Sequence, residues 1–182
     1  QRYPRDPRTL GLYRQDTGRH PDDDPAAWNQ WRANQLTRLV ERTRALVDQR
    51  RPGATLTAAT WGDPRAGYDR YLQNAVGWLR AGLLDAAYPM AYRAAEPEFT
   101  RDILSYRDLA PLGRVVPGLG AYLHARPEAL RAQLERCRAL GGDLAIFSYE
   151  SLYPTVADRP GPRATPPAVR QARLAELRRG LE

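Results

Sequence analysis

Residues 143–149, Asp-Leu-Ala-Ile-Phe-Ser-Tyr, form a short apolar segment that ends in polar and aromatic residues. Three earlier segments have the same character, at Ala54–Trp61, Asp85–Tyr92 and Arg114–Ala121. Each of the four leads into a stretch with the three- and four-residue apolar spacing of an amphipathic helix. Strands that alternate with helices in this way predict an α/β fold with a parallel sheet. Functional residues in such folds lie where the strands end, so a site is expected at the ends of the four segments.

The chain has 182 residues, which is short for a complete (β/α)8 barrel. Such barrels contain roughly 250 residues, and seldom fewer than about 200. Four clear units therefore predict the C-terminal half of a (β/α)8 barrel, with residues 1–182 forming one partial domain. The chain begins Gln1-Arg2-Tyr3-Pro4, without an initiator Met or an apolar leader. We expect this start to be a cut, so it carries no information about localisation.

Composition indicates a folded domain, with 42% hydrophobic and 27% charged residues. No apolar run approaches the ~20 residues of a membrane span, so none is expected. All 28 basic residues are Arg, and the formal net charge is +7. They alternate with acids, as in Glu41-Arg42, and form no compact basic stripe, so we expect no nucleic-acid partner. Cys137 has no second cysteine to pair with and falls in an apolar helical row, which predicts a buried thiol.

Helix signals divide the rest of the chain. Residues 1–24 are rich in Pro, Asp, Arg and Gly, and we expect a long loop there. Asp24-Pro25 begins a helix that ends at Pro52-Gly53. Its expected buried face carries Trp28, Trp31, Leu36, Leu39, Val40, Thr43 and Val47. The later helices have expected inner faces at Tyr68, Leu72, Val76 and Leu79, at Phe99, Ile103 and Leu104, at Leu130, Leu134 and Cys137, and at Val169, Leu174, Leu177 and Leu181.

An ordered set of short motifs resembles the glycosyl-hydrolase-like 10 family. They are Arg2-Tyr3-Pro4, the Trp31–Val47 helix, Trp78–Asp85 (WLRAGLLD), Tyr88–Tyr92 (YPMAY), Gly118–Tyr122 (GLGAY) and Phe147–Tyr149, and they span nearly the whole chain. The resemblance implies a (β/α)8 barrel that acts on glycans, of which this chain covers the end of the fourth strand through the eighth helix. It also implies an extracellular or periplasmic full-length protein, and the N-terminal half of the same barrel as a partner.

The resemblance further implies a catalytic aspartate just before the Arg-Tyr-Pro triplet, because family members typically carry one there. This chain begins one residue before Arg2, so that aspartate is expected to lie upstream. Within the chain, Asp63 and Glu150 follow the first and last strands, and glycoside hydrolysis commonly uses two carboxyl groups. We predict both as catalytic. Two structural alternatives stay open: Asp63 caps a turn or helix, and Glu150 pairs with a loop arginine.

Four aromatic residues lie at or just beyond strand ends: Trp61, Tyr92, Tyr122 and Tyr149. Their rings are suited to stack on sugars, so we predict that they bind substrate together with Arg2 and Tyr3, which close one side. Packing under loops is the alternative for each ring. His20 and His124 lack metal-ligand spacing and are interpreted as polar loop residues. Gly118-Leu119-Gly120 lacks the third glycine of a dinucleotide site, so no metal or cofactor is expected.

The sequence thus predicts a glycoside hydrolase-like protein that acts on a polysaccharide or cell-wall glycan by carboxylate acid/base hydrolysis. A non-catalytic glycan-binding barrel is the main alternative, since the chain shows no complete carboxylate pair. A nucleic-acid-binding protein is a distant third hypothesis that rests on charge alone.

Overall fold

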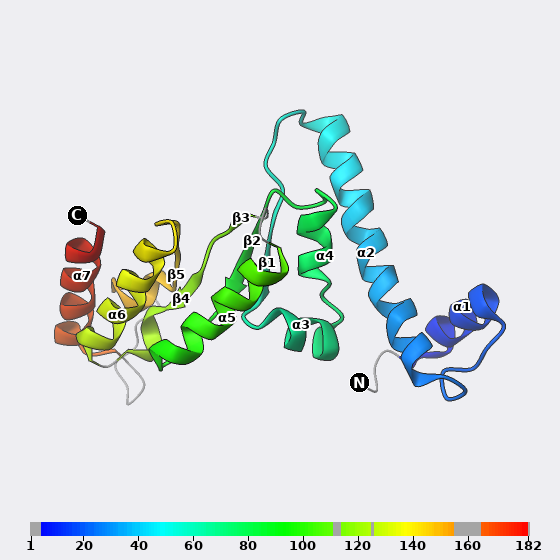
Figure 1. The fold of residues 1–182 in the computed structure, drawn as a ribbon, viewed down its shortest axis with the longest axis horizontal. Coiled ribbons are helices and arrows are strands. Elements are labelled where there is room, and N and C mark those ends of the chain that lie inside the picture. Colours follow the sequence, from blue (N-terminus) through cyan, green and yellow to red (C-terminus); the bar gives the residue numbers. More distant parts are fainter. Residues whose placement is uncertain (1–4, 111–113, 125, 155–164, 182) are drawn as a thin grey trace.

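The computed structural model describes residues 5–110, 114–124, 126–154 and 165–181. The described part of the chain contains one sheet of five short strands. Figure 1 shows helices packed against this sheet and a long helix, α2, beside it. The elements in chain order are α1 (Pro7–Thr17), α2 (Pro25–Arg50), β1 (Thr57–Trp61), α3 (Pro64–Tyr71), α4 (Ala75–Arg80), β2 (Ala86–Met90), α5 (Glu96–Leu109), β3 (Arg114–Val115), β4 (Gly118–Gly120), η1 (Ala121–Leu123), α6 (Pro127–Ala139), β5 (Ala145–Phe147), η2 (Tyr149–Ser151) and α7 (Pro167–Leu181).

The strands form one parallel sheet in the order β1-β2-β4-β5, and β3 also pairs with β2. This confirms the predicted α/β fold with a parallel sheet and flanking helices. The third predicted strand is divided into β3 and β4 at Val116-Pro117, because proline has no N–H to donate to a ladder. Pro89 is accommodated next to the last residue of β2, where the regular ladder is about to end.

One face of the sheet is covered by helices. Ala87, Ala91 and Leu119 of this face are fully buried, and the core continues into α5, α6 and α7 through Phe99, Ile103, Leu130, Leu134, Cys137 and Leu177. A second cluster joins β2 to α4 and to Tyr106 of α5. On β1 the opposite face carries Thr57 and Ala59, which are both exposed. We call this side the uncovered face.

The expected loop over residues 1–24 is wrong in part, because residues 7–17 form α1. Asp6 caps this helix by accepting a hydrogen bond from the Thr9 N–H at 3.1 Å, and Gly18 ends it in the left-handed conformation at φ 70°. Only Tyr13 of α1 is buried, edge-on against Trp28 at 4.9 Å. Tyr13 also meets Trp31 edge-on at 5.3 Å, and the Trp31 indole N–H donates to Asp16 at 2.9 Å. A helix held by one tyrosine, one aspartate and its caps has no apolar stripe that periodicity would reveal.

The expected buried face of α2 is only partly buried. Trp28 is buried, and Leu36 and Val40 pack against the second core cluster. Leu39, however, is 58% exposed, and Thr43 is exposed as well. The cause is visible in Figure 1, where α2 lies beside the sheet rather than across it, so a single narrow side of the helix finds a partner.

The single helix expected after β1 is divided into α3 and α4. Leu72 ends α3 with a left-handed backbone at φ 62°, and Asn74 caps α4 through a 3.2 Å bond from the Gly77 N–H. Between them, the side-chain oxygen of Gln73 accepts the Trp61 N–H at 2.9 Å. The break therefore places a glutamine amide at the end of β1.

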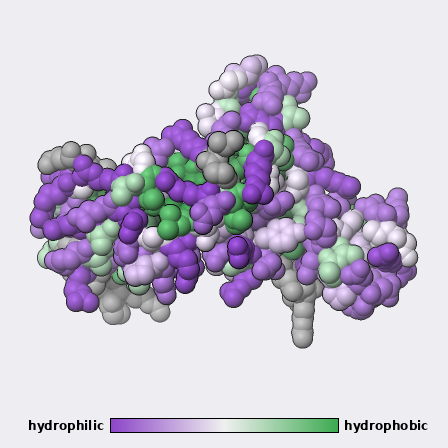
Figure 2. All heavy atoms as spheres, in the orientation of Figure 1, coloured by the Kyte–Doolittle hydropathy of each residue, from purple (hydrophilic) through white to green (hydrophobic). Residues whose placement is uncertain are grey.

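Hydrophilic residues cover most of the surface in Figure 2, and hydrophobic residues gather near the centre of that view. Of the inner face predicted for the last helix, Leu177 is buried, Val169 and Leu174 are partly buried, and the Leu181 side chain lies outside the described part of the structure. Phe99, Ile103, Leu130 and Leu134 are fully buried, whereas Leu104 is 38% exposed. Among the described residues, no helix is both long and apolar enough to cross a membrane.

Candidate functional site

Three aromatic rings meet at the carboxyl ends of β2, β4 and β5. Tyr92 stacks on Phe147, with ring centroids 5.1 Å apart and planes inclined by 17°. Tyr122 meets both rings edge-on, at 6.1 Å from Tyr92 and 6.0 Å from Phe147. Parallel strands deliver their carboxyl ends to one edge, which explains how residues so distant in sequence converge. We call these three residues the aromatic cluster.

The aromatic cluster is open to solvent. Tyr122 is 45% exposed and Phe147 is 49% exposed, whereas Tyr92 is partly buried, and burial raises the pKa of its hydroxyl. Tyr92 and Phe147 also line a cavity of about 270 Å³ on the uncovered face, together with Tyr88, Met90 and Gly118. A Cβ at Gly118 would lie 2.6 Å from the Pro89 carbonyl oxygen, so only glycine fits there.

One buried guanidinium holds the chain on either side of the aromatic cluster. Arg173 of α7 donates from Nε to the His124 carbonyl at 2.8 Å and from Nη1 to the Ser151 carbonyl at 3.0 Å. Its Nη2 reaches the Tyr122 carbonyl at 3.2 Å. Burial, and secondarily the charge of Arg170, lowers the pKa of Arg173. The segments that follow β4 and β5 are thereby fixed by a single side chain.

His124 differs from its predicted role as a polar loop residue, because it is 2% exposed. Its Nε2 lies 3.2 Å from the Gln133 side-chain oxygen, and the Gln133 amide donates to the Arg93 carbonyl at 2.8 Å. Burial lowers the pKa of His124, and the nearby Arg173 lowers it further. A neutral imidazole in this place links the ends of β2 and β4.

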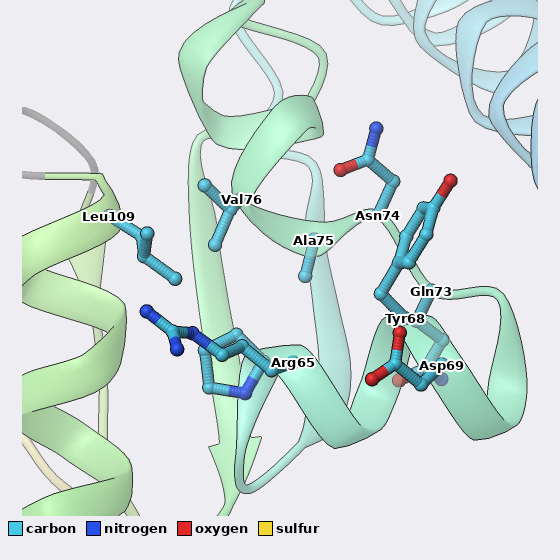
Figure 3. A pocket seen from close by; sticks show the side chains of 9 residues that line it. Arg65, Tyr68, Asp69, Gln73, Asn74, Ala75, Val76 and Leu109 are labelled. Atoms are coloured by element: carbon cyan, nitrogen blue, oxygen red, sulfur yellow. The ribbon is translucent and has the colours of Figure 1, made fainter.

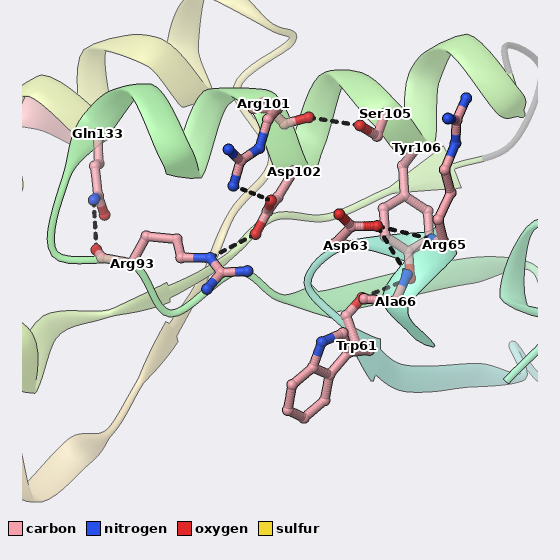
Figure 4. Close-up of polar contacts among 10 residues, drawn as sticks. All are labelled: Trp61, Asp63, Arg65, Ala66, Arg93, Arg101, Asp102, Ser105, Tyr106 and Gln133. Carbon is pink, nitrogen blue, oxygen red and sulfur yellow. Dashed lines mark hydrogen bonds and ion pairs between the residues drawn. The ribbon is translucent and has the colours of Figure 1, made fainter. Parts of the chain in front are cut away.

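Asp63 is the N-cap of α3. Its Oδ1 accepts the backbone N–H groups of Arg65 at 2.8 Å and Ala66 at 3.1 Å, as Figure 4 shows. This is the structural alternative considered for Asp63, and it is compatible with an additional chemical role through Oδ2. The catalytic assignment itself stays a prediction.

Glu150 lies in η2, directly after β5, and is exposed. In the sheet order, β1 and β5 are three strand spacings apart, which is about 14 Å along the sheet. Catalytic carboxyl groups are separated by about 5 Å in retaining glycosidases and by about 6.5–9.5 Å in inverting ones. The strands that carry Asp63 and Glu150 are therefore farther apart than the two carboxyl groups of either class of glycosidase.

The predicted aromatic residues separate into three groups. Tyr92 and Tyr122 contact each other, and Phe147, which the sequence analysis did not select, joins them. Trp61 instead packs on Tyr71 at 4.3 Å. Tyr149, 65% exposed, stacks on Tyr153 at 4.8 Å. The predicted binding residues Arg2 and Tyr3 lie outside the described residues.

A buried ion pair that the sequence analysis missed lies beside the ends of β1 and β2. Arg93 donates from Nε to Oδ2 of Asp102 at 2.7 Å, and the Asp102 side chain is fully buried. Asp102 falls three residues after Phe99 and four before Tyr106, on the buried side of α5. In the sequence, the sign of this pair is a charged residue, Asp102, within an otherwise apolar helical stripe, because a buried carboxylate requires a partner.

Tyr106 fixes the end of β1. Its hydroxyl lies 2.7 Å from the Trp61 carbonyl oxygen, to which it can donate, and 2.8 Å from the Thr60 hydroxyl. Burial raises the pKa of Tyr106 to about 12, so the phenol stays protonated and remains a donor. Figure 4 shows this tyrosine between Asp102 and the end of β1.

A second cavity, of about 310 Å³, lies among α3, α4 and the end of α5 (Figure 3). Three of its polar side chains already make structural bonds. Tyr68 donates to the Gln30 side-chain oxygen at 2.8 Å, Gln73 binds the Trp61 N–H, and Asn74 caps α4. Over the described ranges, no group of three His, Cys, Asp or Glu residues is placed to hold a metal ion.

The chain matches the family described as glycosyl hydrolase-like 10 over residues 2–109, more than half of its length. It belongs to this family. The predicted resemblance is therefore confirmed over the region that contains β1, β2 and α5. The glycosyl hydrolase-like 10 match ends at Leu109, so the motifs Gly118–Tyr122 and Phe147–Tyr149 lie outside it. No curated protein matches the chain.

Proposed function

We propose that this chain is part of a (β/α)8 barrel that hydrolyses glycosidic bonds in a polysaccharide or cell-wall glycan. The observation that carries the proposal is the aromatic cluster: Tyr92, Tyr122 and Phe147 meet at the carboxyl ends of three neighbouring strands and stay open to solvent. Membership of a glycosyl hydrolase-like family supports the substrate class. Barrel enzymes carry their sites at this end of the sheet.

Aromatic side chains bind sugars through two kinds of contact. Ring faces pack on the apolar C–H groups of a sugar, and tyrosine hydroxyls bond its oxygens. Phe147 supplies ring surface only, whereas Tyr92 and Tyr122 offer a hydroxyl as well. We propose that these three form the main sugar-binding surface, that Trp61 and Tyr149 extend it to either side, and that Arg2 and Tyr3 close one side.

The catalytic carboxyl groups are proposed as Asp63 and Glu150. Because they follow β1 and β5, which lie at opposite edges of the sheet, we propose that each works with a carboxylate from the rest of the barrel, including an aspartate upstream of Arg2. One group would donate a proton to the leaving oxygen, and the other would act as nucleophile or base. A glycan substrate of this kind would place the full-length protein in the extracellular or periplasmic space.

A non-catalytic glycan-binding barrel is the second candidate. The observation in its favour is the bonding of Asp63, whose Oδ1 already accepts two backbone N–H groups at the start of α3. A capping carboxylate is sufficient reason for an aspartate at this position.

The test measures release of reducing sugar ends by the full-length protein on a panel of soluble polysaccharides. Glu150→Gln and Asp63→Asn should each lower turnover about 100-fold, as expected for loss of acid/base help. Asn still caps a helix, so Asp63→Asn should leave thermal stability unchanged, whereas Asp63→Ala should cost about 1 kcal/mol. Asp69→Asn, a nearby exposed change, is the matched control.

Phe147→Ala and Tyr122→Ala should each weaken binding of the same polysaccharides about tenfold. Each change removes an aromatic ring on which a sugar packs, and such a contact contributes on the order of 1 kcal/mol or more to the free energy of binding. Full turnover in both carboxylate variants would remove Asp63 and Glu150 from the mechanism. Binding without turnover in the unmodified protein would favour the non-catalytic alternative. Absence of binding to every polysaccharide would overturn the glycan assignment.

A further inference from the structure

Arg93 is held more rigidly than an ordinary partly exposed arginine. Its N–H donates to the Ala91 carbonyl at 2.9 Å, and its own carbonyl accepts from Gln133 at 2.8 Å. Its Nε is bound to the buried carboxylate of Asp102 at 2.7 Å. Both backbone polar groups and one side-chain donor are therefore fixed, and the guanidinium has a set direction.

The other side-chain donors of Arg93 have no bonding partner among the described residues. A guanidinium carries five N–H donors, of which Asp102 takes the one on Nε. Within the part of the chain that the structure describes, no carboxylate or carbonyl bonds the two terminal nitrogens, and the side chain is 35% exposed. A pair of parallel donors in one plane matches the two oxygens of a carboxylate.

The local charge favours an anion. Arg101 also approaches Asp102, with Nη2 3.6 Å from Oδ1, and its side chain is 64% exposed. One carboxylate faces two guanidinium groups, which leaves the trio with a formal charge of +1. Asp102 thus orients Arg93 without neutralising this end of the sheet.

We infer that Arg93 binds the carboxylate of an acidic sugar, such as a uronic acid, within the glycan held by the aromatic cluster. Arg93 follows Tyr92 directly in the chain, so its Cα lies about 3.8 Å from that of a cluster residue. The two residues are thus neighbours at the end of β2, and the inference is that a sugar on Tyr92 presents its carboxylate to the terminal nitrogens of Arg93. This inference rests on the proposed function, and it names the substrate class for the same surface.

The test compares two ligands that differ only in charge. Isothermal titration of the full-length protein with hexagalacturonate and with its fully methyl-esterified form measures the preference for a free carboxylate. We expect the acid to bind at least tenfold more tightly than the ester, because a charge-assisted bidentate pair is lost in the ester.

The key variant is Arg93→Gln combined with Asp102→Asn. Changing Arg93 alone would leave a buried carboxylate unpaired and could unfold the protein, whereas the double change keeps a neutral pair in its place. The double variant should bind the acid and the ester about equally well, and its affinity for the ester should equal that of the unmodified protein. Arg114→Gln removes the same charge at the opposite end of the strands, beside Asp143, and should leave the preference intact.

Three outcomes would overturn the inference. Equal binding of acid and ester to the unmodified protein would do so while leaving the proposed glycan function standing. An undiminished preference in the folded double variant, verified by circular dichroism and a thermal melt, would also do so. Failure to bind either hexamer would remove the acidic-sugar assignment, and the polysaccharide panel above decides separately whether any glycan binds.

Discussion

At the scale of single residues, His124 shows how burial sets a charge state. Its imidazole is enclosed between Gln133 and Arg173, and burial lowers its pKa. In the unfolded chain the same histidine titrates near pH 6.5. Between its folded and unfolded pKa values the unfolded chain binds more protons, so the free energy of unfolding falls as pH decreases below about 6.5. The fall ends once the pH has passed the folded pKa.

We therefore expect urea unfolding to show a loss of stability between pH 7 and pH 5.5, with a slope of at most about 1.4 kcal/mol per pH unit from this residue. His124→Gln should remove that slope, and His20→Gln should retain it. Asp85 and Glu176 have lowered pKa values, so their contributions are lost only at lower pH, below about 4.5. The same pH profile in His124→Gln as in the unmodified chain would refute the assignment.

Cys137 offers a second residue-scale prediction. Its thiol is 1% exposed, and burial raises its pKa to about 11. The thiolate is the reactive form, so the folded chain should resist iodoacetamide at pH 8. Mass spectrometry should find Cys137 modified only after addition of denaturant. Rapid labelling under native conditions would show that α6 opens readily from the core.

At the scale of elements, Arg173 joins α7 to the segments after β4 and β5 through three carbonyl oxygens. Arg173→Met should lower the free energy of unfolding by at least about 2 kcal/mol, since three charge-assisted bonds are lost. Hydrogen exchange should accelerate at residues 121–124 and 148–153, with β1 and β2 unaffected. Arg178→Met, an exposed change on the same helix, is the control. Uniform acceleration across the chain would indicate that Arg173 supports the whole fold instead.

Elements also show what the sequence could predict. The strands were predicted from apolar segments that end in polar or aromatic residues, which is a local property. The α1 helix was missed because it depends on Asp6, Gly18 and the contacts of one tyrosine, Tyr13, rather than on an apolar stripe. The break at Leu72 was missed because nothing in its side chain signals a left-handed backbone.

The same reasoning applies to the candidate site. Tyr92 and Tyr122 were found because a strand end is visible in sequence, but their contact with Phe147 depends on the order of the strands. Trp61 was expected to join them, and a neighbour from α3, Tyr71, covers it instead. The link between Arg93 and Asp102 spans nine residues and two elements, so it became evident only from the packing of α5.

At the scale of the whole molecule, the sheet has helices on one side and the uncovered face on the other. Thr57 and Ala59 are exposed on β1, which is an edge strand of the sheet within the described ranges, and such an edge favours association. Sedimentation velocity on this chain should show sedimentation coefficients that rise with concentration. Thr57→Lys should reduce this effect, and Thr55→Lys, just before the strand, should not. A monomer at every concentration would contradict the proposal that another part of a barrel belongs here.

The glutamine between α3 and α4 determines how far such pairing can extend. The Asp85 N–H bonds the Leu56 carbonyl, so alternation along a parallel ladder turns the backbone groups of Thr57, Ala59 and Trp61 toward the open side of β1. Gln73 already occupies the Trp61 N–H. An incoming strand can therefore form backbone hydrogen bonds with Thr57 and Ala59 but not with the N–H of Trp61. This limit sets the register of the incoming strand. It also keeps backbone pairing away from the end of β1, where substrate is proposed to bind.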